Sequence, residues 1–299
     1  MTELDKIEGL KGTLKFDEPM SRYTSWRIGG PADRFFVPRD LDDLRYFLAH
    51  LPVDEPLTWI GLGSNLLIRD KGIRGTVIAT RNVMDELEQP GPGQISAGSG
   101  VPCAKLARYS VRAGLAGAEF LVGIPGTLGG ALAMNAGAFG SETWEIIKQV
   151  KTVNRKGEIH IRDKSEFTIA YRSVSGPEEE WFVSALAELP PDHNHTGNNT
   201  IRELLARRSE TQPMGEASCG SVFRNPGSDT PAAKLIDSCG LKGKYTGQAR
   251  ISDKHANFII NTGTATAADI EALIKHVQEV VFEKYQVMLV PEVRVIGDK

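Results

Sequence analysis

Cysteine is scarce in this 299-residue sequence, and neither sign of charge dominates it. Its three cysteines, Cys103, Cys219 and Cys239, are odd in number and widely spaced, which argues against a disulfide framework and a zinc site. Reduced thiols are the simplest interpretation. The net charge is −3, from 35 Lys and Arg against 38 Asp and Glu. We therefore expect neither a basic nucleic-acid binder nor an acidic disordered protein.

Segments typical of export or membrane insertion are also missing. The N-terminal residues MTELDKIEGLKGTLKFDEP contain no apolar stretch of the kind that a signal peptide carries. Residues 120–141 form an uncharged run of 22 residues, which is long enough to span a bilayer. Six of them are glycine, however, and Pro125, Asn135 and Ser141 interrupt the rest. We expect no membrane span and a cytoplasmic location.

The spacing of apolar residues predicts an α+β fold. Asp40 is expected to cap a helix whose buried face includes Leu44 and Leu48. A second capping pattern, Thr266 with Asp269, precedes a long amphipathic helix. The other expected helices are 102–113, 201–208 and 230–240. The expected strands are 33–39, 57–60, 76–79, a hairpin of 150–154 with 158–162, then 181–187, 221–225, 256–261 and 287–297.

The polar residues 188–200, ELPPDHNHTGNNT, have no apolar period and are the best linker candidate. We therefore predict a glycine-rich α+β region up to about residue 190, followed by a separate α/β module of about 100 residues.

Glycine is the one residue type in surplus. Sixteen of the 31 glycines lie between Gly61 and Gly140. Glycine-rich loops let backbone N–H groups approach an anion, and GLGSN (61–65) and IPGTLGG (124–130) fit this pattern, as does 135–140. The first loop is not a dinucleotide-binding fingerprint of the Rossmann type, because Leu66 stands where the third glycine would be. Tight turns remain the alternative for each loop alone, but together the loops favour a large phosphate-bearing ligand such as FAD.

Three side chains are candidates for chemistry, each with a plain alternative. Ser221 begins a short apolar segment, and an ordinary strand-starting serine would look the same. Glu292 alternates with valines near the end of the chain, as an exposed glutamate also would. Arg172 follows an apolar strand, where it can recognise a carboxylate or simply lie at the surface. No GxSxG motif supports a hydrolase, and His193 and His195 have no third ligand nearby, so no metal is expected.

Seven segments, in order, carry a family likeness. They are GLGSNLL, IPGTLGGALAMNAGAFG, YRSVSG, CGSVFRNP, PAAKLIDSCGLKG, SDKHANFIIN and VPEVRVIG. In this order they resemble UDP-N-acetylenolpyruvoylglucosamine reductase, a family that makes UDP-N-acetylmuramate for bacterial peptidoglycan. The likeness covers nearly the whole chain, from about Tyr23 to Gly297.

The resemblance implies an N-terminal extension over 1–22 and a non-covalent FAD in a binding domain of the vanillyl-alcohol-oxidase (PCMH) type over 23–190. This domain would be split into two subdomains, about 23–82 and 83–190, and a C-terminal α/β domain over 199–299 would bind the UDP-sugar. The resemblance also implies NADPH as electron source and UDP-N-acetylenolpyruvoylglucosamine as substrate, and we expect a monomer. The residues implied to hold FAD are Gly61, Leu62, Gly63, Ser64, Asn65, Leu66, Gly123, Ile124, Pro125, Gly126, Gly129, Gly130, Asn135, Ala136 and Gly137.

The resemblance further implies three catalytic residues. Hydride passes from N5 of reduced FAD to C3 of the enolpyruvyl group, and Arg172 with a protonated Glu292 stabilises the enolate charge. Ser221 then gives a proton to C2 as general acid. The residues implied to contact substrate are Tyr171, Arg224, Asn225 and Lys242.

The chain departs from some members in one respect. The stretch from Arg172 to Ser221 is short and resembles the form without an inserted tyrosine loop, so no closing tyrosine is assigned. Two other functions stay open on the sequence alone: a different flavoenzyme on the same fold, and a nucleotide-binding module without turnover.

Overall fold

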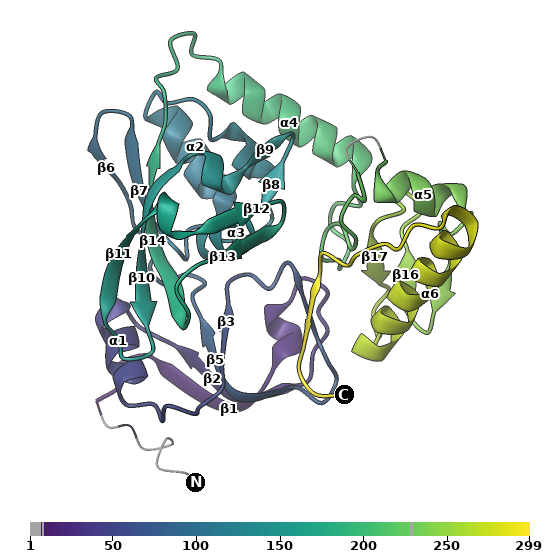
Figure 1. Ribbon diagram of the computed structural model, residues 1–299, viewed down its shortest axis with the longest axis horizontal. Helices are drawn as coiled ribbons and strands as arrows, with labels where there is room; N and C mark the ends of the chain where they lie inside the picture. The colour runs from purple at the N-terminus through teal and green to yellow at the C-terminus, as the bar shows by residue number, and fades with distance from the viewer. Residues whose placement is uncertain (1–6, 8, 228–229) are drawn as a thin grey trace. The chain divides into compact units, whose positions relative to one another are not determined.

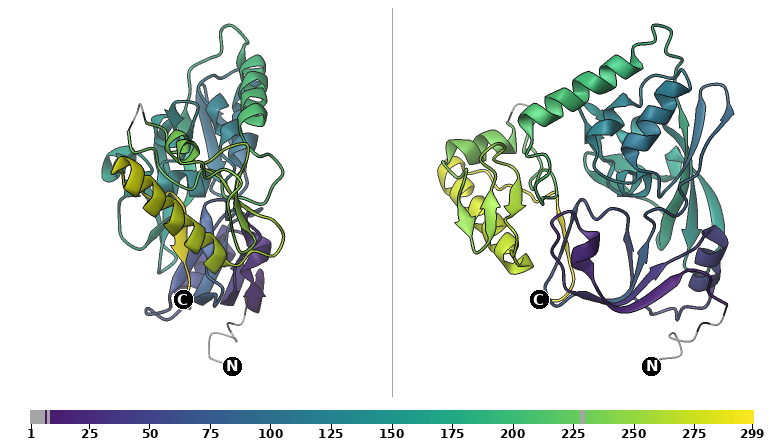
Figure 2. Two further views of the ribbon diagram at one scale, coloured as in Figure 1. Left: turned by 90° about the vertical axis from the view of Figure 1, so that its right-hand side faces the viewer. Right: turned by 180° about the vertical axis from the view of Figure 1, so that it is seen from behind.

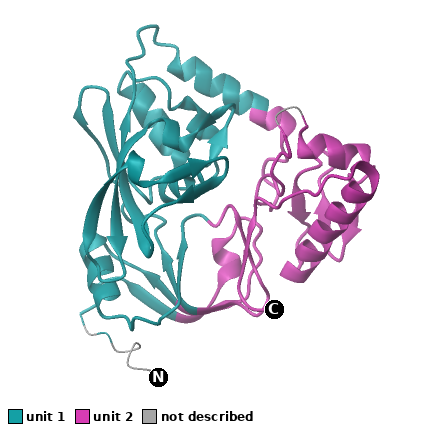
Figure 3. Ribbon diagram, viewed as in Figure 1, with its two compact units in different colours: residues 1–15, 35–62, 75–207 teal, residues 16–34, 63–74, 208–299 magenta. Residues whose placement is uncertain are grey.

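The computed structural model describes Ile7, residues 9–227 and residues 230–299. Part of the predicted N-terminal extension, residues 1–6 and 8, lies outside the described residues. The chain divides into two compact units (Figure 3). Unit 1 comprises residues 1–15, 35–62 and 75–207, and unit 2 comprises residues 16–34, 63–74 and 208–299.

The first sheet has the strand order β1-β2-β5-β3. Strands β3 and β5 are parallel, with Ile60 opposite Ala79, and the helix between β2 and β3 is α1. The Asp40 carboxylate accepts a 2.9 Å hydrogen bond from the N–H of Asp43 and caps α1 as predicted. The bounds are β1 (Thr13–Pro19), β2 (Pro31–Val37), α1 (Leu41–Ala49), β3 (Leu57–Ile60) and β5 (Ile73–Ala79).

A second sheet, entirely in unit 1, has the order β11-β10-β14-β7-β6. Helix α3 packs against β14 and β7, and Figure 1 shows α2 and α3 together beside this sheet. The predicted hairpin is confirmed, because β10 and β11 pair antiparallel. The bounds are β6 (Leu87–Gly91), β7 (Gln94–Gly98), α2 (Cys103–Arg112), β10 (Ile147–Asn154), β11 (Ile159–Asp163) and β14 (Glu180–Glu188).

The glycine-rich run contains structure of its own. Its apolar side chains, including Leu121, Leu128 and Leu132, are buried in the core of unit 1, which explains why the run carries no charge. No helix in the described part of the chain is both long and apolar enough to cross a membrane. The bounds are η3 (Glu119–Gly123), α3 (Leu128–Met134), β8 (Gly137–Ala138) and β9 (Ser141–Glu142), and the short elements that follow are η4 (Thr143–Glu145), η5 (Lys164–Glu166), β12 (Thr168–Ala170) and β13 (Ser173–Ser175).

Unit 2 is built around helix α6. The predicted capping box is present: the Thr266 hydroxyl accepts from the N–H of Asp269, and the Asp269 carboxylate accepts from the N–H of Thr266. The apolar stripe of α6 is buried as predicted, and α6 packs against β15, β16 and α5 (Figure 2). Strands β18 and β4 pair in parallel. The bounds are η2 (Met20–Tyr23), β4 (Leu66–Ile68), α5 (Ala232–Ser238), β15 (Tyr245–Thr246), β16 (Ala249–Ile251), β17 (Ile259–Asn261), α6 (Ala267–Tyr285) and β18 (Arg294–Ile296).

Three expectations about these elements are wrong. Residues 221–225 form no strand, and only Phe223 makes an isolated bridge, to Pro291. The last strand is confined to β18, because the N–H groups of Glu292 and Val293 both donate to the carbonyl oxygen of Val222 and not to a strand. Helix α4 (Gly197–Thr211) begins inside the predicted linker, because the Asp192 carboxylate accepts hydrogen bonds from the N–H groups of Thr196 and Gly197.

Candidate functional site

The first glycine loop begins where β3 ends. A Cβ built on Gly61 would overlap the Thr127 Oγ1 atom, so only glycine lets these two loops of unit 1 approach so closely. The backbone N–H groups of Gly61 and Leu62 donate no hydrogen bond to a described residue. The N–H groups of Gly63 and Ser64, which belong to unit 2, also donate to no described residue. In unit 1, the N–H groups of Gly61 and Leu62 are therefore open to an acceptor.

The second glycine run ends in the first turn of α3. The N–H groups of Leu128 and Gly129 donate to the carbonyl oxygens of Val101 and Ser99. Those of Thr127 and Gly130 donate to no described residue. Helix N-termini with open N–H groups favour anions.

Two buried hydroxyl groups lie in this region. Ser99 and Thr127 are each 1% exposed, and their Oγ and Oγ1 atoms have no hydrogen-bond partner among the described residues. A Cβ on Gly129 would lie 2.9 Å from the Ser99 Cβ. Buried hydroxyl groups normally have a hydrogen-bond partner. These two hydroxyls therefore indicate a polar site whose hydrogen bonds are not all supplied by the described residues.

Other predicted cofactor residues shape the run without offering donors. Gly123 is packed so closely that a Cβ would lie 2.5 Å from the Phe139 ring. The N–H of Ile124 donates to Leu121, and the N–H of Gly126 donates to the carbonyl oxygen of Ile124 across Pro125. These residues fix the backbone path that leads to α3.

The third loop holds Arg172. Asn135 ends α3 in the left-handed conformation, at φ 47°, and the N–H groups of Asn135 and Ala136 donate back into α3. The carbonyl oxygens of Asn135 and Gly137 accept from Arg172 Nη1 and Nη2, at 3.3 and 2.9 Å. A further ion pair joins Arg172 to Glu142 at 3.7 Å. The predicted FAD loop and the predicted catalytic arginine are thus one hydrogen-bonded assembly in unit 1.

The backbone of Arg172 is itself unusual. Its φ is +54°, a conformation that costs a non-glycine residue about 1–3 kcal/mol and clusters at functional sites. Its side chain is 14% exposed, and the guanidinium lies 4.9 Å from the ring centroid of Tyr171. The surrounding loop therefore determines where the guanidinium points.

Unit 2 brings Ser221 and Glu292 together. The N–H of Glu292 donates to the carbonyl oxygen of Val222, the residue after Ser221, at 2.7 Å. The Asn65 carboxamide donates to the carbonyl oxygen of Glu292 at 3.0 Å, and the N–H of Arg294 donates to the carbonyl oxygen of Asn65. The end of the first glycine loop thereby fixes the backbone at Glu292. Leu66 follows as the first residue of β4.

Cys219, two residues before Ser221, is a structural thiol. Its Sγ lies 3.4 Å from the Ser25 Oγ and 3.4 Å from the carbonyl oxygen of Leu66. Burial raises the pKa of the Cys219 thiol to about 12. It therefore stays protonated at neutral pH and has no nucleophilic character.

The predicted substrate residues of unit 2 are spread over several elements. The N–H of Arg224 donates to the carbonyl oxygen of Val290. The Asn225 Oδ1 accepts from the N–H of Ala232 at 3.0 Å, at the start of α5, and Lys242 pairs with Asp237 at 2.7 Å. In unit 1, Tyr171 is 47% exposed. Their role in binding a UDP-sugar stays a prediction.

Comparison with known proteins decides the family. A family model of the C-terminal domain of UDP-N-acetylenolpyruvoylglucosamine reductase matches residues 212–296, and a model of an FAD binding domain matches residues 32–162. The UDP-N-acetylenolpyruvoylglucosamine reductase of Methylococcus capsulatus is 56% identical over 288 residues, 96% of this chain and 94% of that protein. The reductase of Alkalilimnicola ehrlichii is 56% identical over 96% of both chains. The chain belongs to the UDP-N-acetylenolpyruvoylglucosamine reductase family.

A solved structure agrees. The UDP-N-acetylenolpyruvylglucosamine reductase of Thermus caldophilus matches with a TM-score of 0.82 and 30% identity, covering 96% of this chain and 99% of that one. The predicted fold class, an FAD-binding domain of the vanillyl-alcohol-oxidase type followed by the reductase's C-terminal domain, is confirmed.

The residues present fit the FAD that this family's first domain implies. The open N–H groups of Gly61, Leu62, Thr127 and Gly130 are donors of the kind that bind phosphate oxygens. The unsatisfied hydroxyls beside them add a polar lining. The histidine-, cysteine- and carboxylate-bearing residues of the described chain form no group that could hold a metal ion.

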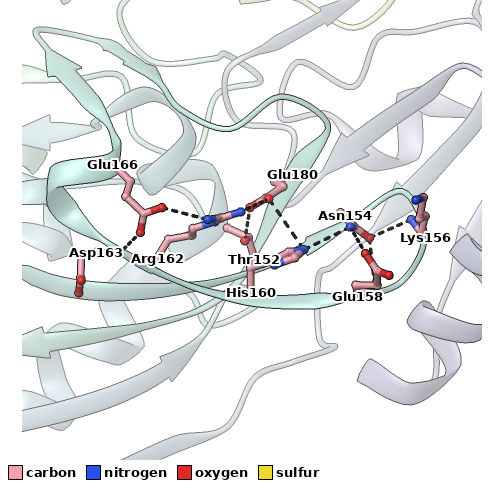
Figure 4. Close-up of polar contacts among 9 residues, drawn as sticks. All are labelled: Thr152, Asn154, Lys156, Glu158, His160, Arg162, Asp163, Glu166 and Glu180. Carbon is pink, nitrogen blue, oxygen red and sulfur yellow. Dashed lines mark hydrogen bonds and ion pairs between the residues drawn. The ribbon is translucent and has the colours of Figure 1, made fainter.

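A separate polar cluster lies on β10, β11 and β14 (Figure 4). Arg162 bonds both carboxylate oxygens of Glu180, at 2.6 and 3.1 Å. The Thr152 hydroxyl donates to Glu180 as well, and Arg162 also reaches Glu166. The Arg162 guanidinium, with help from Thr152, holds the pKa of Glu180 below its usual value. This cluster joins three strands of unit 1 and contains none of the reductase family's predicted site residues.

Ser99, Thr127 and Asn257 are not among the residues predicted to act in the site. Thr127 lies between Gly126 and Gly129, which are predicted cofactor residues, and this position is what could have indicated its role. Asn257 lies inside the segment SDKHANFIIN, but nothing in its spacing indicates which backbone groups it meets.

Proposed function

We propose that this protein is an FAD-dependent reductase that uses NADPH to reduce the enolpyruvyl group of UDP-N-acetylenolpyruvoylglucosamine. The product is the lactyl ether UDP-N-acetylmuramate, for bacterial peptidoglycan. The observation that carries this proposal is 56% identity over 96% of the chain to a reductase of that name. The open backbone donors of both glycine loops support it.

When bound, FAD accepts hydride from NADPH and supplies it to C3 of the enolpyruvyl group. The chain's own part begins with holding the cofactor's phosphates through the N–H groups of Gly61, Leu62, Thr127 and Gly130. Backbone donors suit this task, because they cost no side-chain entropy and are fixed before the ligand arrives.

Arg172 is proposed to stabilise negative charge on the substrate carboxylate and the developing enolate. Its fixed guanidinium is a preorganised donor, and removal of one such donor typically lowers the rate by 10²–10³-fold. Glu292, in its protonated form, is proposed to add a hydrogen bond to the same charge. Both roles remain predictions about the reaction.

Ser221 is proposed to give the proton that C2 receives. A serine hydroxyl is a weak acid, so it needs a strongly basic acceptor, and an enolate is one. The hydroxyl makes no hydrogen bond to a described residue, so its proton is not committed to another protein group.

The remaining assignments are proposals of the same kind. Tyr171, Arg224, Asn225 and Lys242 would contact the UDP-sugar, and the chain would act as a cytoplasmic monomer of the short form without a tyrosine loop. The domain boundaries 23–190 and 199–299 also stay predictions.

The test measures two things on the purified protein. The preparation should show flavin absorption, and acid should release FAD into solution. NADPH oxidation should then accelerate when UDP-N-acetylenolpyruvoylglucosamine is added. Flavin that NADPH bleaches but this substrate does not reoxidise would indicate a different flavoenzyme, and a preparation that never binds FAD would overturn the proposal.

A further inference from the structure

Ser221 lies on a segment that no regular strand supports. Val222 and Phe223 are buried, yet the segment has only the isolated bridge between Phe223 and Pro291. A general acid must be held within hydrogen-bond reach of the atom that it protonates. Some other group has to fix the path of this backbone.

Asn257 supplies that support on one side. Its Oδ1 accepts from the N–H of Phe223 at 2.9 Å, and its Nδ2 donates to the carbonyl oxygen of Phe223 at 2.8 Å. Its own carbonyl oxygen accepts from the N–H of Val222 at 2.8 Å. One residue therefore makes three hydrogen bonds to the two residues that follow Ser221.

The Asn257 side chain bonds Phe223 in the way that the backbone of a neighbouring β-strand would. A carboxamide carries one acceptor and donors in a plane, as a peptide group does, and here it pairs with both backbone groups of Phe223. Asn257 is 3% exposed, so water cannot replace these bonds easily. Loss of the carboxamide would leave the Phe223 N–H and carbonyl without that partner.

The opposite side is held by the backbone near Glu292. The N–H of Glu292 donates to the carbonyl oxygen of Val222, and the N–H of Arg224 donates to the carbonyl oxygen of Val290. The segment after Ser221 is thus held between Asn257 and residues 290–292. Asn257 is the part of this arrangement that depends on a side chain.

We propose that Asn257 is a positioning residue that fixes the Ser221 hydroxyl for proton transfer through the two hydrogen bonds of its carboxamide to Phe223. This inference rests on the proposed function, because it requires Ser221 to be the proton donor. A misplacement of about 1 Å at a reacting group can cost about 100-fold in rate. Removal of the carboxamide should therefore affect the substrate step and spare the NADPH step.

The experiment separates the two half-reactions by stopped-flow absorption of the bound flavin. Asn257→Ala should be reduced by NADPH at the wild-type rate. Its reoxidation by UDP-N-acetylenolpyruvoylglucosamine should be slower by about 10- to 100-fold. Equal slowing of both half-reactions, or no slowing of either, would overturn the proposal.

Asn261 provides a matched control. It is also a buried asparagine, 7% exposed, and its carboxamide bonds backbone groups of Trp26, Gly263 and Ala265. Asn261→Ala should lower the melting temperature without selectively slowing reoxidation. If it slows reoxidation as much as Asn257→Ala does, the effect is general destabilisation and the proposal is wrong.

A double variant tests whether Asn257 acts through Ser221. If it does, Ser221→Ala with Asn257→Ala should reoxidise no more slowly than Ser221→Ala alone, since residues that act as a unit are not additive. Multiplied losses would contradict the proposal. Should Asn257→Ala fail to fold, Asn257→Asp keeps the shape and Oδ1 but lacks the donor to Phe223, and the same predictions apply to it.

A failure of the proposed function would look different. In that case the wild-type protein itself would not be reoxidised by UDP-N-acetylenolpyruvoylglucosamine. A wild-type protein that turns over, with a Ser221→Ala variant that is equally fast, would remove Ser221 as donor and the role of Asn257 with it.

Discussion

The backbone N–H of Glu292 donates a 2.7 Å hydrogen bond to the carbonyl oxygen of Val222. This bond joins the C-terminal segment to the residue that follows Ser221, although the two lie far apart in the sequence. Because it is a backbone bond, it survives substitution of either side chain. The side-chain chemistry of Ser221 and Glu292 can therefore be tested without removing the contact that aligns their backbones.

Ser221→Ala should uncouple the two half-reactions. NADPH should still bleach the flavin at the wild-type rate, because no proton from Ser221 is needed for that step. Reoxidation by UDP-N-acetylenolpyruvoylglucosamine should slow by about 10²–10⁴-fold, the range that general acids contribute. Stopped-flow absorption measures both rates.

Ser218→Ala is the control for that variant. Ser218 is half-buried like Ser221 and lies on the same segment, so its loss reports on general damage there. Rapid reoxidation of Ser221→Ala by substrate would show that another group supplies the proton.

Local patterns predicted the elements whose determinants lie close together in sequence. The Thr266 capping box and the buried stripe of α6 involve neighbours within one or two turns. The Asp40 cap of α1 is equally local. Each of these was predicted from spacing alone, and each is confirmed.

The parts that sequence reasoning could not supply depend on distant partners. The segment at Val222 is held by Asn257 and Glu292, and no periodicity reports such bonds. Arg172 has a positive φ, and its side chain bonds the carbonyl oxygen of Asn135, 37 residues earlier in the chain. Local sequence propensity indicates neither arrangement, because the hydrogen bonds at Val222 and Arg172 join residues that are far apart in the sequence.

Arg172→Lys should retain FAD and lose most turnover. Lysine keeps the positive charge but cannot span the carbonyl oxygens of Asn135 and Gly137 with one planar group. We expect the reoxidation rate with substrate to fall by about 10²–10³-fold. The flavin spectrum and the rate of reduction by NADPH should change little.

Arg155→Lys is a suitable comparison. Arg155 also lies in unit 1, and its side chain is 16% exposed and pairs with Glu179 at 2.8 Å. The same substitution there removes a comparable guanidinium group from a position with no predicted catalytic role. If both variants lose turnover to the same extent, Arg172 has no special part in the reaction.

Gly61→Ala should weaken FAD binding. A methyl group at Gly61 would overlap the Thr127 Oγ1 atom, and the buried Thr127 side chain has little room to move. Overpacking of this kind costs about 1–3 kcal/mol. If that strain falls on the FAD-bound state, the dissociation constant for FAD should rise by about 10- to 100-fold.

Titration of the apoprotein with FAD, followed by flavin fluorescence, gives that constant. Gly91→Ala is the matched control, because a Cβ there would lie 3.4 Å from its nearest neighbour, an atom of Gln94, in ordinary contact. Unchanged FAD affinity in Gly61→Ala would contradict the placement of the cofactor's phosphates at this loop.

Glu180→Gln should destabilise unit 1 in a pH-dependent way. The Glu180 side chain is 8% exposed and carries a charge-assisted pair with Arg162, so its loss should cost about 1–3 kcal/mol at neutral pH. The pKa of Glu180 is lowered in the folded protein, chiefly by Arg162. Its contribution is therefore full above the ordinary glutamate pKa of about 4.3 and is lost as the pH falls through the folded-state pKa.

Urea unfolding at pH 7 and at successively lower pH measures this difference between wild type and variant. The gap in unfolding free energy should stay constant down to about pH 5 and close below the ordinary glutamate pKa. Glu88→Gln is the control, because Glu88 is exposed on β6 of the same sheet and its side chain forms no hydrogen bond or ion pair with a described residue. A gap for Glu180→Gln that widened toward low pH would show that the carboxylate is less stable, not more stable, in the folded protein.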